Sequence, residues 1–208
     1  MKVVLFNGSP RENGNTFIAL SAAIDELNLA GIETELIQIG SQPITGCMGC
    51  GACRQAFENR CVFNDAQFDE WVDKVYAADG IIVGSPVYYA GVNGTVKSFL
   101  DRLFYQSAGK LRQKVAACAV IARRAGGVST ADQILHYFSN AEMFIAPGCY
   151  WTAAYGRTEG EVTQDEEGLA VVRQSARNMA YLLKLKAYAG DAVPAPERVS
   201  YTATHFFR

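Results

Sequence analysis

Short apolar runs alternate along the chain with longer segments of helical periodicity. The apolar runs, rich in β-branched residues, predict strands at residues 3–6, 33–39, 80–84, 115–122 and 144–150. The intervening segments predict helices at residues 16–30, 67–78, 92–104, 130–143 and about 166–189. Strands that are apolar throughout and separated by helices indicate a parallel sheet that is covered on both faces.

Five strands in this alternation predict an α/β fold with a doubly wound, five-stranded parallel sheet in the order 2-1-3-4-5. We expect one domain over residues 1–189, with a cysteine-rich insertion at residues 46–64 after the second strand. Residues 190–208 form a C-terminal tail whose aromatic end, at residues 205–208, is expected to dock on the domain or on a second subunit. Ligands of such sheets bind at the carboxyl ends of the strands, so the loops after strands one, three and four should carry the function.

Composition narrows the classes of partner. The 208 residues include 19 basic and 21 acidic side chains, for a net charge of -2, with no long run of either sign. We therefore expect neither a nucleic acid nor an anionic membrane as partner. The apolar run at residues 3–6 is too short for a signal-peptide core, and no stretch approaches the ~20 residues that span a bilayer. A cytoplasmic location is expected, where thiols are kept reduced.

The loop after the first strand, residues 7–16, has the sequence NGSPRENGNT. Backbone N–H groups, hydroxyl and amide side chains, the charge of Arg11 and a helix N-terminus together favour a phosphate site. Asn15 stands where a nucleoside-triphosphate loop needs lysine, and the glycine spacing of a dinucleotide fingerprint is absent. A phosphomonoester bound without metal is the interpretation that survives, against an ordinary turn capped by Asn15 or Thr16.

The loop after the third strand, residues 85–94, carries two tyrosines and two glycines on a turn fixed by Pro86. Such a loop can present backbone amides and an aromatic wall to a flat polar ring. Two tyrosines that only filled a core would not need this loop.

These two loops carry a resemblance to the flavodoxin-like NAD(P)H-dependent FMN reductase family, over roughly residues 1–185. The motifs that resemble the family are Gly8-Ser9-Pro10-Arg11, Gly14-Asn15-Thr16 and Ser85-Pro86-Val87-Tyr88, with Lys97, Phe99, Asp101 and Arg102 on the helix behind. The resemblance implies a flavodoxin-like, FMN-binding domain in which the flavin carries the chemistry and no side chain is catalytic.

The resemblance also implies which residues hold the flavin. The FMN phosphate would be bound by Ser9, Arg11, Asn13, Asn15 and Thr16. The isoalloxazine ring would be lined by Pro86, Val87, Tyr88, Tyr89 and Gly91. A third contact, at residues 123–127 after strand four, would use Arg124, Gly126 and Gly127, whose glycines permit close backbone approach. Arg124 departs from the small residues expected there, and it either binds a phosphate of the nicotinamide cofactor or, as we favour, pairs with a surface carboxylate.

The cysteine-rich insertion places Cys47, Cys50, Cys53 and Cys61 in the spacing C-x2-C-x2-C-x7-C. This pattern resembles the iron–sulfur flavoproteins, a branch of the same family that carries a 4Fe-4S cluster beside FMN. Gly49 and Gly51 let the backbone turn around a cluster, and Arg54 and Arg60 can offset its negative charge. Free or disulfide-forming thiols remain an alternative; zinc is less favoured because structural zinc sites usually use two separated pairs of ligands.

The expected function is that of an FMN-dependent oxidoreductase. It would take a hydride or electrons from NAD(P)H or a reduced, ferredoxin-like carrier and pass them to an unidentified acceptor, with the 4Fe-4S cluster as an intermediate carrier. The alternatives are an electron carrier without its own NAD(P)H activity and a flavin-free phosphate-binding module. A homodimer or homotetramer is expected, because a ring bound at loop tips stays half exposed unless a second subunit covers it.

A few other residues with chemical potential receive ordinary structural interpretations. Cys118 and Cys149 are expected to be small buried residues, and His136 a packed or surface histidine. Trp71 and Trp151 are expected in the core or at an interface.

Overall fold

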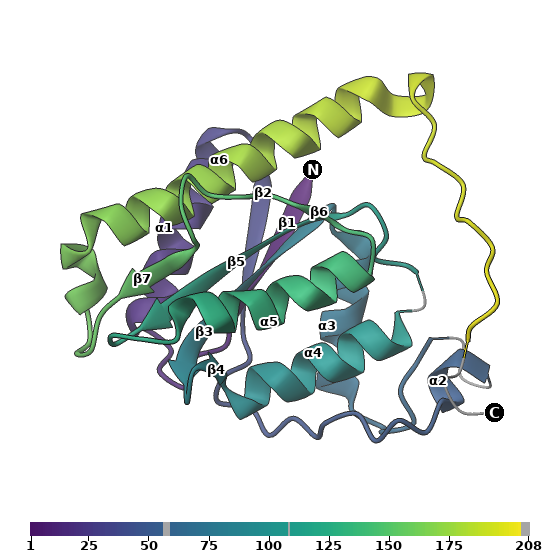
Figure 1. Ribbon diagram of the computed structural model, residues 1–208, viewed down its shortest axis with the longest axis horizontal. Helices are drawn as coiled ribbons and strands as arrows, with labels where there is room; N and C mark the ends of the chain where they lie inside the picture. Colours follow the sequence, from purple (N-terminus) through teal and green to yellow (C-terminus); the bar gives the residue numbers. More distant parts are fainter. Residues whose placement is uncertain (56–58, 108, 205–208) are drawn as a thin grey trace.

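A twisted sheet divides the computed structural model, which describes residues 1–55, 59–107 and 109–204 (Figure 1). Its parallel strands are β1 (Lys2–Asn7), β2 (Glu33–Gln38), β3 (Gly80–Tyr88), β5 (Val115–Ala122), β6 (Phe144–Ile145) and β7 (Ala153–Tyr155). The order β2-β1-β3-β5-β6 confirms the predicted 2-1-3-4-5 arrangement and the flavodoxin-like α/β class. The sheet has seven strands rather than five, because β3 turns back into the short antiparallel β4 (Gly91–Val92) and β7 also pairs with β5.

The predicted fifth strand at residues 144–150 is wrong in its second half. Phe144 pairs with Val115 at one end of β5, and Ala153 pairs with Val120 near the other end, so the edge is divided into two short strands. The chain leaves the sheet between them at Pro147, which has no N–H to donate to a ladder. Gly148 then lies against α6, since a Cβ there would come 2.6 Å from Val171 Cγ1.

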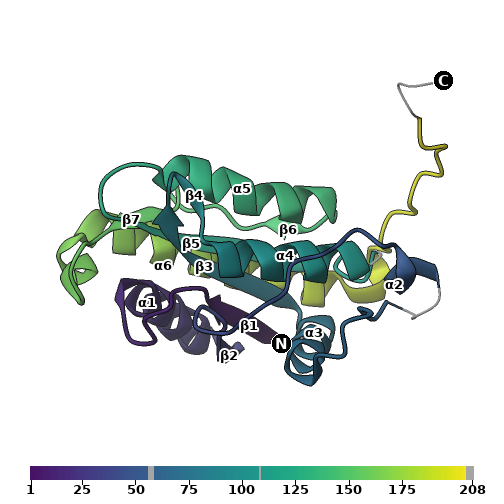
Figure 2. The same cartoon turned by 90° about the horizontal axis from the view of Figure 1, so that it is seen from below.

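Helices cover both faces of the sheet, as Figure 2 shows. One face is packed by α1 (Asn15–Leu29) and α6 (Glu166–Ala189). The other is packed by α3 (Ala66–Ala77), α4 (Gly94–Gln106) and α5 (Gly127–Asn140). These helices begin and end within three residues of the predicted bounds, and the remaining helical turns are α2 (Ala52–Gln55), η1 (Glu161–Gln164) and η2 (Gly190–Ala192).

The core follows the two-residue period of the strands. Along β1, Val3 and Leu5 join the cluster beneath α1 and α6, while Val4 and Phe6 join the cluster on the opposite face. Both faces are thus apolar, which is why the strands appear in the sequence as continuous apolar runs.

The isolated cysteines and tryptophans divide between core and surface. Trp71 is buried against Phe99, with ring centroids 6.1 Å apart, which confirms the core interpretation, whereas Trp151 is 60% exposed. Cys118 is buried as predicted, and burial raises the pKa of its thiol to about 12. The prediction for Cys149 is wrong: it is exposed, because it lies in the excursion between β6 and β7 rather than in a strand. His136 is a surface histidine.

The C-terminal tail leaves α6 and runs along one end of the domain (Figure 1). It is fixed to the domain where the Arg112 guanidinium donates to Pro196 O at 2.7 Å and where Arg198 pairs with Glu142 at 2.9 Å. The aromatic end at 205–208, whose docking was predicted, lies outside the described residues. Within the described ranges, no helix is both long and apolar enough to cross a membrane.

Candidate functional site

The loop between β1 and α1 is folded by its own polar side chains. Asn7 donates from its amide to Glu12 O at 3.0 Å and accepts the N–H of Ser9 at 3.1 Å, and Ser9 Oγ accepts the N–H of Arg11 at 3.1 Å. The N-cap of α1 is Gly14, and no side chain caps the helix, so the alternative of a turn capped by Asn15 or Thr16 is wrong. The first N–H groups of α1 therefore have no side-chain acceptor, which is the arrangement that binds an anion.

The predicted phosphate ligands occupy different positions around this loop. Ser9 and Thr16 are buried, whereas Arg11 and Asn13 are exposed. The Asn15 side chain is already engaged, since its amide donates to Thr158 O at 2.8 Å and accepts the N–H of Val162 at 3.3 Å. What Asn15 offers an anion is therefore its backbone N–H, while its side chain ties the loop to residues 156–162.

The predicted ring-binding loop is a β-hairpin. Val87 pairs with Val92 and Tyr88 with Gly91, and the turn residues Tyr89 and Ala90 have φ values of 49° and 58°. A two-residue turn with both φ values positive normally uses glycine or asparagine, and each other residue there costs about 1–3 kcal/mol. Such strain persists only where the surroundings enforce it, and it is typical of ligand-binding loops.

Helix α5 holds this hairpin in place. Ser129 donates from its hydroxyl to Ala90 O at 2.8 Å, and the N–H of Val92 donates to Gln133 Oε1 at 3.2 Å. Gly91 is packed below Gln133, because a Cβ at Gly91 would come 2.9 Å from Gln133 Oε1. Tyr88 and Tyr89 remain 49% and 106% exposed, so their rings are available to a ligand or a second subunit.

The loop after β5 contacts the hairpin directly. Gly126 has a φ of 88°, and a Cβ at this position would lie 2.7 Å from Ala90 Cα. Gly127 begins α5 beside β7, where an added Cβ would lie 2.8 Å from Ala153 Cβ. Between the two loops is a hollow of about 260 Å³, lined by Val87, Tyr89, Ala90, Arg123, Arg124 and Ala125. The structure thus brings the second and third predicted contact loops together.

Arg124 borders this hollow with an exposed side chain. The pairing with a surface carboxylate that the sequence favoured is absent from the described part of the chain, where Arg124 forms no ion pair. The exposed Arg124 side chain thus lines the hollow without a carboxylate partner among the described residues.

Asn93 connects the first loop to the hairpin, a role that sequence reasoning missed. Its Oδ1 accepts the N–H of Val96 at 2.8 Å as the N-cap of α4, and its Nδ2 donates to Gly8 O. The approach is close, since a Cβ at Gly8 would come 2.1 Å from Val96 Cγ2. Its position before the first helical residue was a usable N-cap signal, but the bond to Gly8 was not visible in the sequence.

The four predicted cluster ligands meet at a second hollow. Cys47, Cys50, Cys53 and Cys61 all line it, together with Met48, Val62, Phe63, Arg102, Tyr105 and Gln106. None of the four forms a disulfide. Gly49 and Gly51, with φ values of 69° and 74°, provide the predicted backbone turns between the first three cysteines.

Electrostatic conditions in this hollow disfavour the thiolate of Cys53. The pKa of Cys53 is raised by burial and then by the negative charge of Cys61, with smaller contributions from Cys47 and Cys50, while Arg54 opposes the shift. The arginines predicted to offset a cluster charge are partly used elsewhere: Arg54 donates to Tyr105 O at 3.0 Å, and Arg60 pairs with Asp73.

The geometry bears on which metal group would fit. In the described ranges no three Cys, His, Asp or Glu side chains converge closely enough to hold a metal ion. Structural zinc needs four ligands around one point, whereas the thiolates of a 4Fe-4S cluster are spread over separate irons. Four cysteines around one hollow match the donor set of such a cluster. The hollow measures about 20 Å³, close to the space of one water, so the segment must open to take a cluster.

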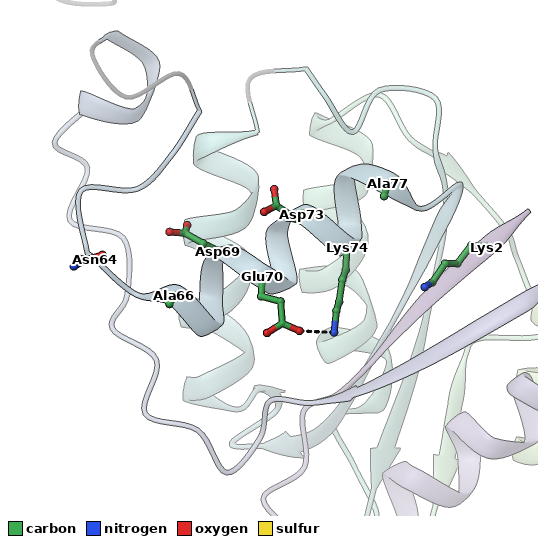
Figure 3. Close-up of a pocket in the computed structure, with 8 residues that line it drawn as sticks. All are labelled: Lys2, Asn64, Ala66, Asp69, Glu70, Asp73, Lys74 and Ala77. Carbon is green, nitrogen blue, oxygen red and sulfur yellow. Dashed lines mark ion pairs between the residues drawn. The ribbon is translucent and has the colours of Figure 1, made fainter.

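A broader hollow of about 650 Å³ lies along α3 and is unlike either site (Figure 3). Its charged side chains are largely paired, with one another or with neighbours: Lys74 contacts Glu70 at 2.6 Å, and both Lys74 and Lys2 contact the adjacent Glu35, at 2.8 and 2.7 Å. Charges satisfied in this way leave little for a ligand, so we assign no site to this groove.

Comparison with known proteins relates these loops to a family. A family model described as NADPH-dependent FMN reductase matches residues 1–158. An iron–sulfur flavoprotein of Methanocaldococcus jannaschii is 36% identical over 193 residues, which cover 89% of this chain and 98% of that protein. The chain belongs to the NADPH-dependent FMN reductase family, among the iron–sulfur flavoproteins.

Other relatives of this FMN reductase-like flavoprotein agree. An iron–sulfur flavoprotein of Methanosarcina thermophila is 32% identical over 188 residues, covering 89% of this chain and 96% of that protein. The solved structure of RosB with bound 8-demethyl-8-formylriboflavin-5'-phosphate has a TM-score of 0.70 and 17% identity, covering 100% of this chain and 95% of that one. At that identity the likeness concerns the fold alone. The match confirms the family on which the sequence prediction rested and supports an oxidoreductase.

Proposed function

We propose that this protein is an FMN-dependent oxidoreductase that takes a hydride or electrons from NAD(P)H or a reduced ferredoxin-like carrier. It passes them to an acceptor by way of a 4Fe-4S cluster. The observation that carries the proposal is the meeting of the strained hairpin and the 123–127 loop around one hollow, at the carboxyl ends of β3 and β5. That position is where doubly wound sheets bind their ligands.

The residues present fit FMN. The uncapped N-terminus of α1 offers the N–H groups of Asn15 and Thr16 to a phosphate, with the Ser9 hydroxyl and the Arg11 guanidinium beside it. Asn13 lies at the exposed rim of the same loop. The residues that would hold the ring are the segment from Pro86 to Gly91 and the loop that contains Gly126 and Gly127. When bound, FMN supplies hydride and one-electron chemistry, and the protein supplies orientation and electrostatics.

Arg124 is proposed to recognise the electron donor. Its guanidinium borders the hollow without a carboxylate partner among the described residues, and a guanidinium suits a phosphate of NADH or NADPH. The choice between these donors would then depend on whether a 2′-phosphate reaches Arg124.

The four cysteines are proposed to hold the 4Fe-4S cluster, which supplies one-electron transfer when bound. Their thiols surround one hollow, none is committed to a disulfide, and burial with mutual repulsion raises the pKa of Cys53. Coordination by iron relieves that repulsion, since a bound metal group favours the deprotonated thiol. The segment then carries electrons to or from the flavin of the same domain.

A second copy of the chain is proposed to cover the flavin edge. Five aromatic side chains at the end of β3, in the turn after it, or in and before β7 are at least 44% exposed: Tyr88, Tyr89, Tyr150, Trp151 and Tyr155. Exposed aromatic residues in such number are typical of interfaces, which favours a homodimer or homotetramer. Light scattering on the flavin-loaded protein tests this directly, and a monomer at micromolar concentration contradicts it.

Anaerobic purification followed by chemical analysis tests the main proposal. We expect about one FMN, four irons and four acid-labile sulfides per chain, and oxidation of NADH or NADPH with an artificial acceptor. Bound FMN and iron without NAD(P)H oxidation, but with rapid exchange with reduced ferredoxin, would favour the electron-carrier alternative. A colourless protein that does not bind added FMN would leave only a phosphate-binding module.

A further inference from the structure

Two buried polar side chains beside the cysteine hollow lack hydrogen-bond partners. Arg102 and Gln106 both line the hollow and are each only 1% exposed. They are four residues apart on α4, so they present their side chains on the same face of that helix. Both therefore face the region that the four cysteines surround.

Only one edge of the Arg102 guanidinium is in use. Its Nη1 pairs with Asp65 Oδ2 at 3.0 Å and lies 3.5 Å from Thr45 O, and its planar face lies 3.7 Å from the centroid of the Phe68 ring. Its Nε and Nη2, which form the opposite forked edge, have no partner. A buried cation with unused donors is costly, which indicates that an acceptor belongs at this edge.

Gln106 adds a second set of unused groups. Neither its Nε2 nor its Oε1 has a partner at hydrogen-bond geometry. The Tyr76 hydroxyl donates to Ser107 Oγ at 3.5 Å, and the Gln106 amide lies near enough to that hydroxyl to oppose the rise that burial causes in the pKa of Tyr76. One buried amide without partners is unusual in a native protein, and here it adjoins the unused guanidinium edge.

The chemistry of the hollow defines the missing acceptor. Its other walls are the four thiols and the apolar or aromatic side chains of Met48, Val62, Phe63 and Tyr105. The thiol and apolar walls favour a soft, anionic group held by the thiols over a hydrated anion. A sulfur-ligated iron cluster has this character, since hydrogen bonds to its sulfurs and its burial set its reduction potential.

We propose that the Nε–Nη2 edge of Arg102 and the amide of Gln106 donate hydrogen bonds to the sulfurs of the cysteine-held cluster. Arg102 thereby raises the reduction potential of the cluster. The inference rests on the proposed cluster. Reduction adds one electron to an already anionic group, so the hydrogen bonds donated to its sulfurs become stronger and stabilise the reduced form more than the oxidised form. Both residues are positioning residues: they act on the cluster and hold no iron.

The test is an anaerobic spectroelectrochemical titration of the whole protein, with the cluster followed by electron paramagnetic resonance and FMN by absorption. Arg102→Lys keeps a positive charge that can pair with Asp65, but it lacks the forked Nε–Nη2 edge. At the wild-type midpoint we expect a tenfold or greater increase in the ratio of oxidised to reduced cluster, which is about 59 mV for one electron. Gln106→Met, of similar volume, should shift the same ratio in the same direction by a smaller factor.

Asp65→Asn is the matched control. It removes the carboxylate on the used side of Arg102 and leaves the unused edge intact. If the effect of Arg102 comes only from its ion pair with Asp65, this variant lowers the cluster potential, whereas Arg102→Lys, which retains that contact, leaves it unchanged. Our proposal predicts an unchanged or slightly higher potential, because a negative charge near the guanidinium has been removed.

The outcomes separate this inference from the proposed function. Iron-free wild-type protein after anaerobic purification means that the cluster itself is wrong. Iron-loaded variants at Arg102 and Gln106 whose cluster potentials equal that of the wild type overturn the inference and leave the cluster in place. FMN content and the flavin potential report on folding, and Gln106→Met keeps the test decisive if Arg102→Lys does not fold.

Discussion

The flavin face and the cysteine-rich segment are built in opposite ways. The flavin loops continue buried strands, and long-range bonds such as those of Asn15 to Thr158 and Asn93 to Gly8 hold them. In the segment at residues 46–64, regular structure within the described residues is limited to α2. Few hydrogen bonds form inside the described part of this segment, and one of them is the bond from the Asn59 N–H to Cys53 O, at 2.8 Å. The first site is formed by the fold. The second has the unpaired donors of Arg102 and Gln106 and four thiols, with no common partner among the described residues.

This difference predicts that the two proposed cofactors have different relations to folding. A site whose shape comes from a hydrophobic core forms before its ligand binds. Burying polar groups without partners costs free energy. A site in which only the metal group provides those partners is stabilised when the metal group binds. We therefore expect changes at one site to leave the other largely intact, and the predictions below test that independence.

The largest expected effect is loss of the cluster in Cys50→Ser. Iron should fall from about four per chain to below one, while FMN stays near one per chain, because the flavin loops make no use of this thiol. Cys149→Ser, which removes an exposed cysteine outside the segment, is the control and should retain its iron. Loss of FMN together with iron in Cys50→Ser would show that the two sites are not independent.

The reverse experiment is Gly126→Ala. Its φ of 88° and its approach to Ala90 Cα leave no room for a Cβ, so the hairpin must move. We expect at least a tenfold loss of FMN affinity and a stability cost of about 1–3 kcal/mol, with iron content unchanged. Gly31→Ala has a similar φ of 77° but open space around it. It should lose some stability and no FMN affinity, measured by fluorescence titration and urea unfolding.

A smaller effect is expected from Arg124→Ala. If this guanidinium binds a nucleotide phosphate, the KM for the preferred pyridine nucleotide should rise about tenfold, the loss of one charge-assisted hydrogen bond, with kcat nearly constant. Arg123 lines the same hollow, so Arg123→Ala is the control for loss of local positive charge. Steady-state kinetics measures KM in both variants. If KM rises equally in the two, Arg124 contributes only general positive charge and does not bind the phosphate specifically.

The smallest effect is expected from Asn93. Asn93→Ala removes the N-cap of α4 and the bond to Gly8 O, and should cost about 1–2 kcal/mol in the free energy of unfolding. Asn93→Asp keeps an acceptor for the N–H of Val96 but cannot donate to Gly8. Chemical denaturation should place the aspartate variant between wild type and alanine. If aspartate matches wild type in stability and FMN affinity, the bond to Gly8 does not hold the two loops together.

The elements that the sequence predicted well are those whose signal is local. Strands β1 and β5 are continuous buried runs, and their apolar pattern alone marks them. The extension of β3 was missed because Pro86 suggested a turn, although the hairpin pairing of Val87 with Val92 lies beyond it. The division of the sheet edge into β6 and β7 was missed for a similar reason: the position of Ala153 depends on pairing with β5.

The candidate site shows the same limit. The contact loops could be predicted because they follow strand ends, and the four cysteines because their spacing is compact. The engagement of the Asn15 side chain joins residues 143 positions apart, and the unused edge of Arg102 is defined only by what packs around it. Sequence patterns identify which residue types gather, whereas tertiary packing decides which of their atoms remain available.

The two outer edges of the sheet have a consequence for aggregation. On one edge, β2 carries Glu33 and Glu35, which pair with Lys2 at 3.3 and 2.7 Å, so an approaching strand would meet charges along its length. On the other, β6 and β7 are only 2 and 3 residues long. Neither edge offers a long, flat, apolar template of the kind that recruits further strands into fibrils. Copies of this chain can therefore associate through side-chain surfaces without the risk of extending one another's sheets.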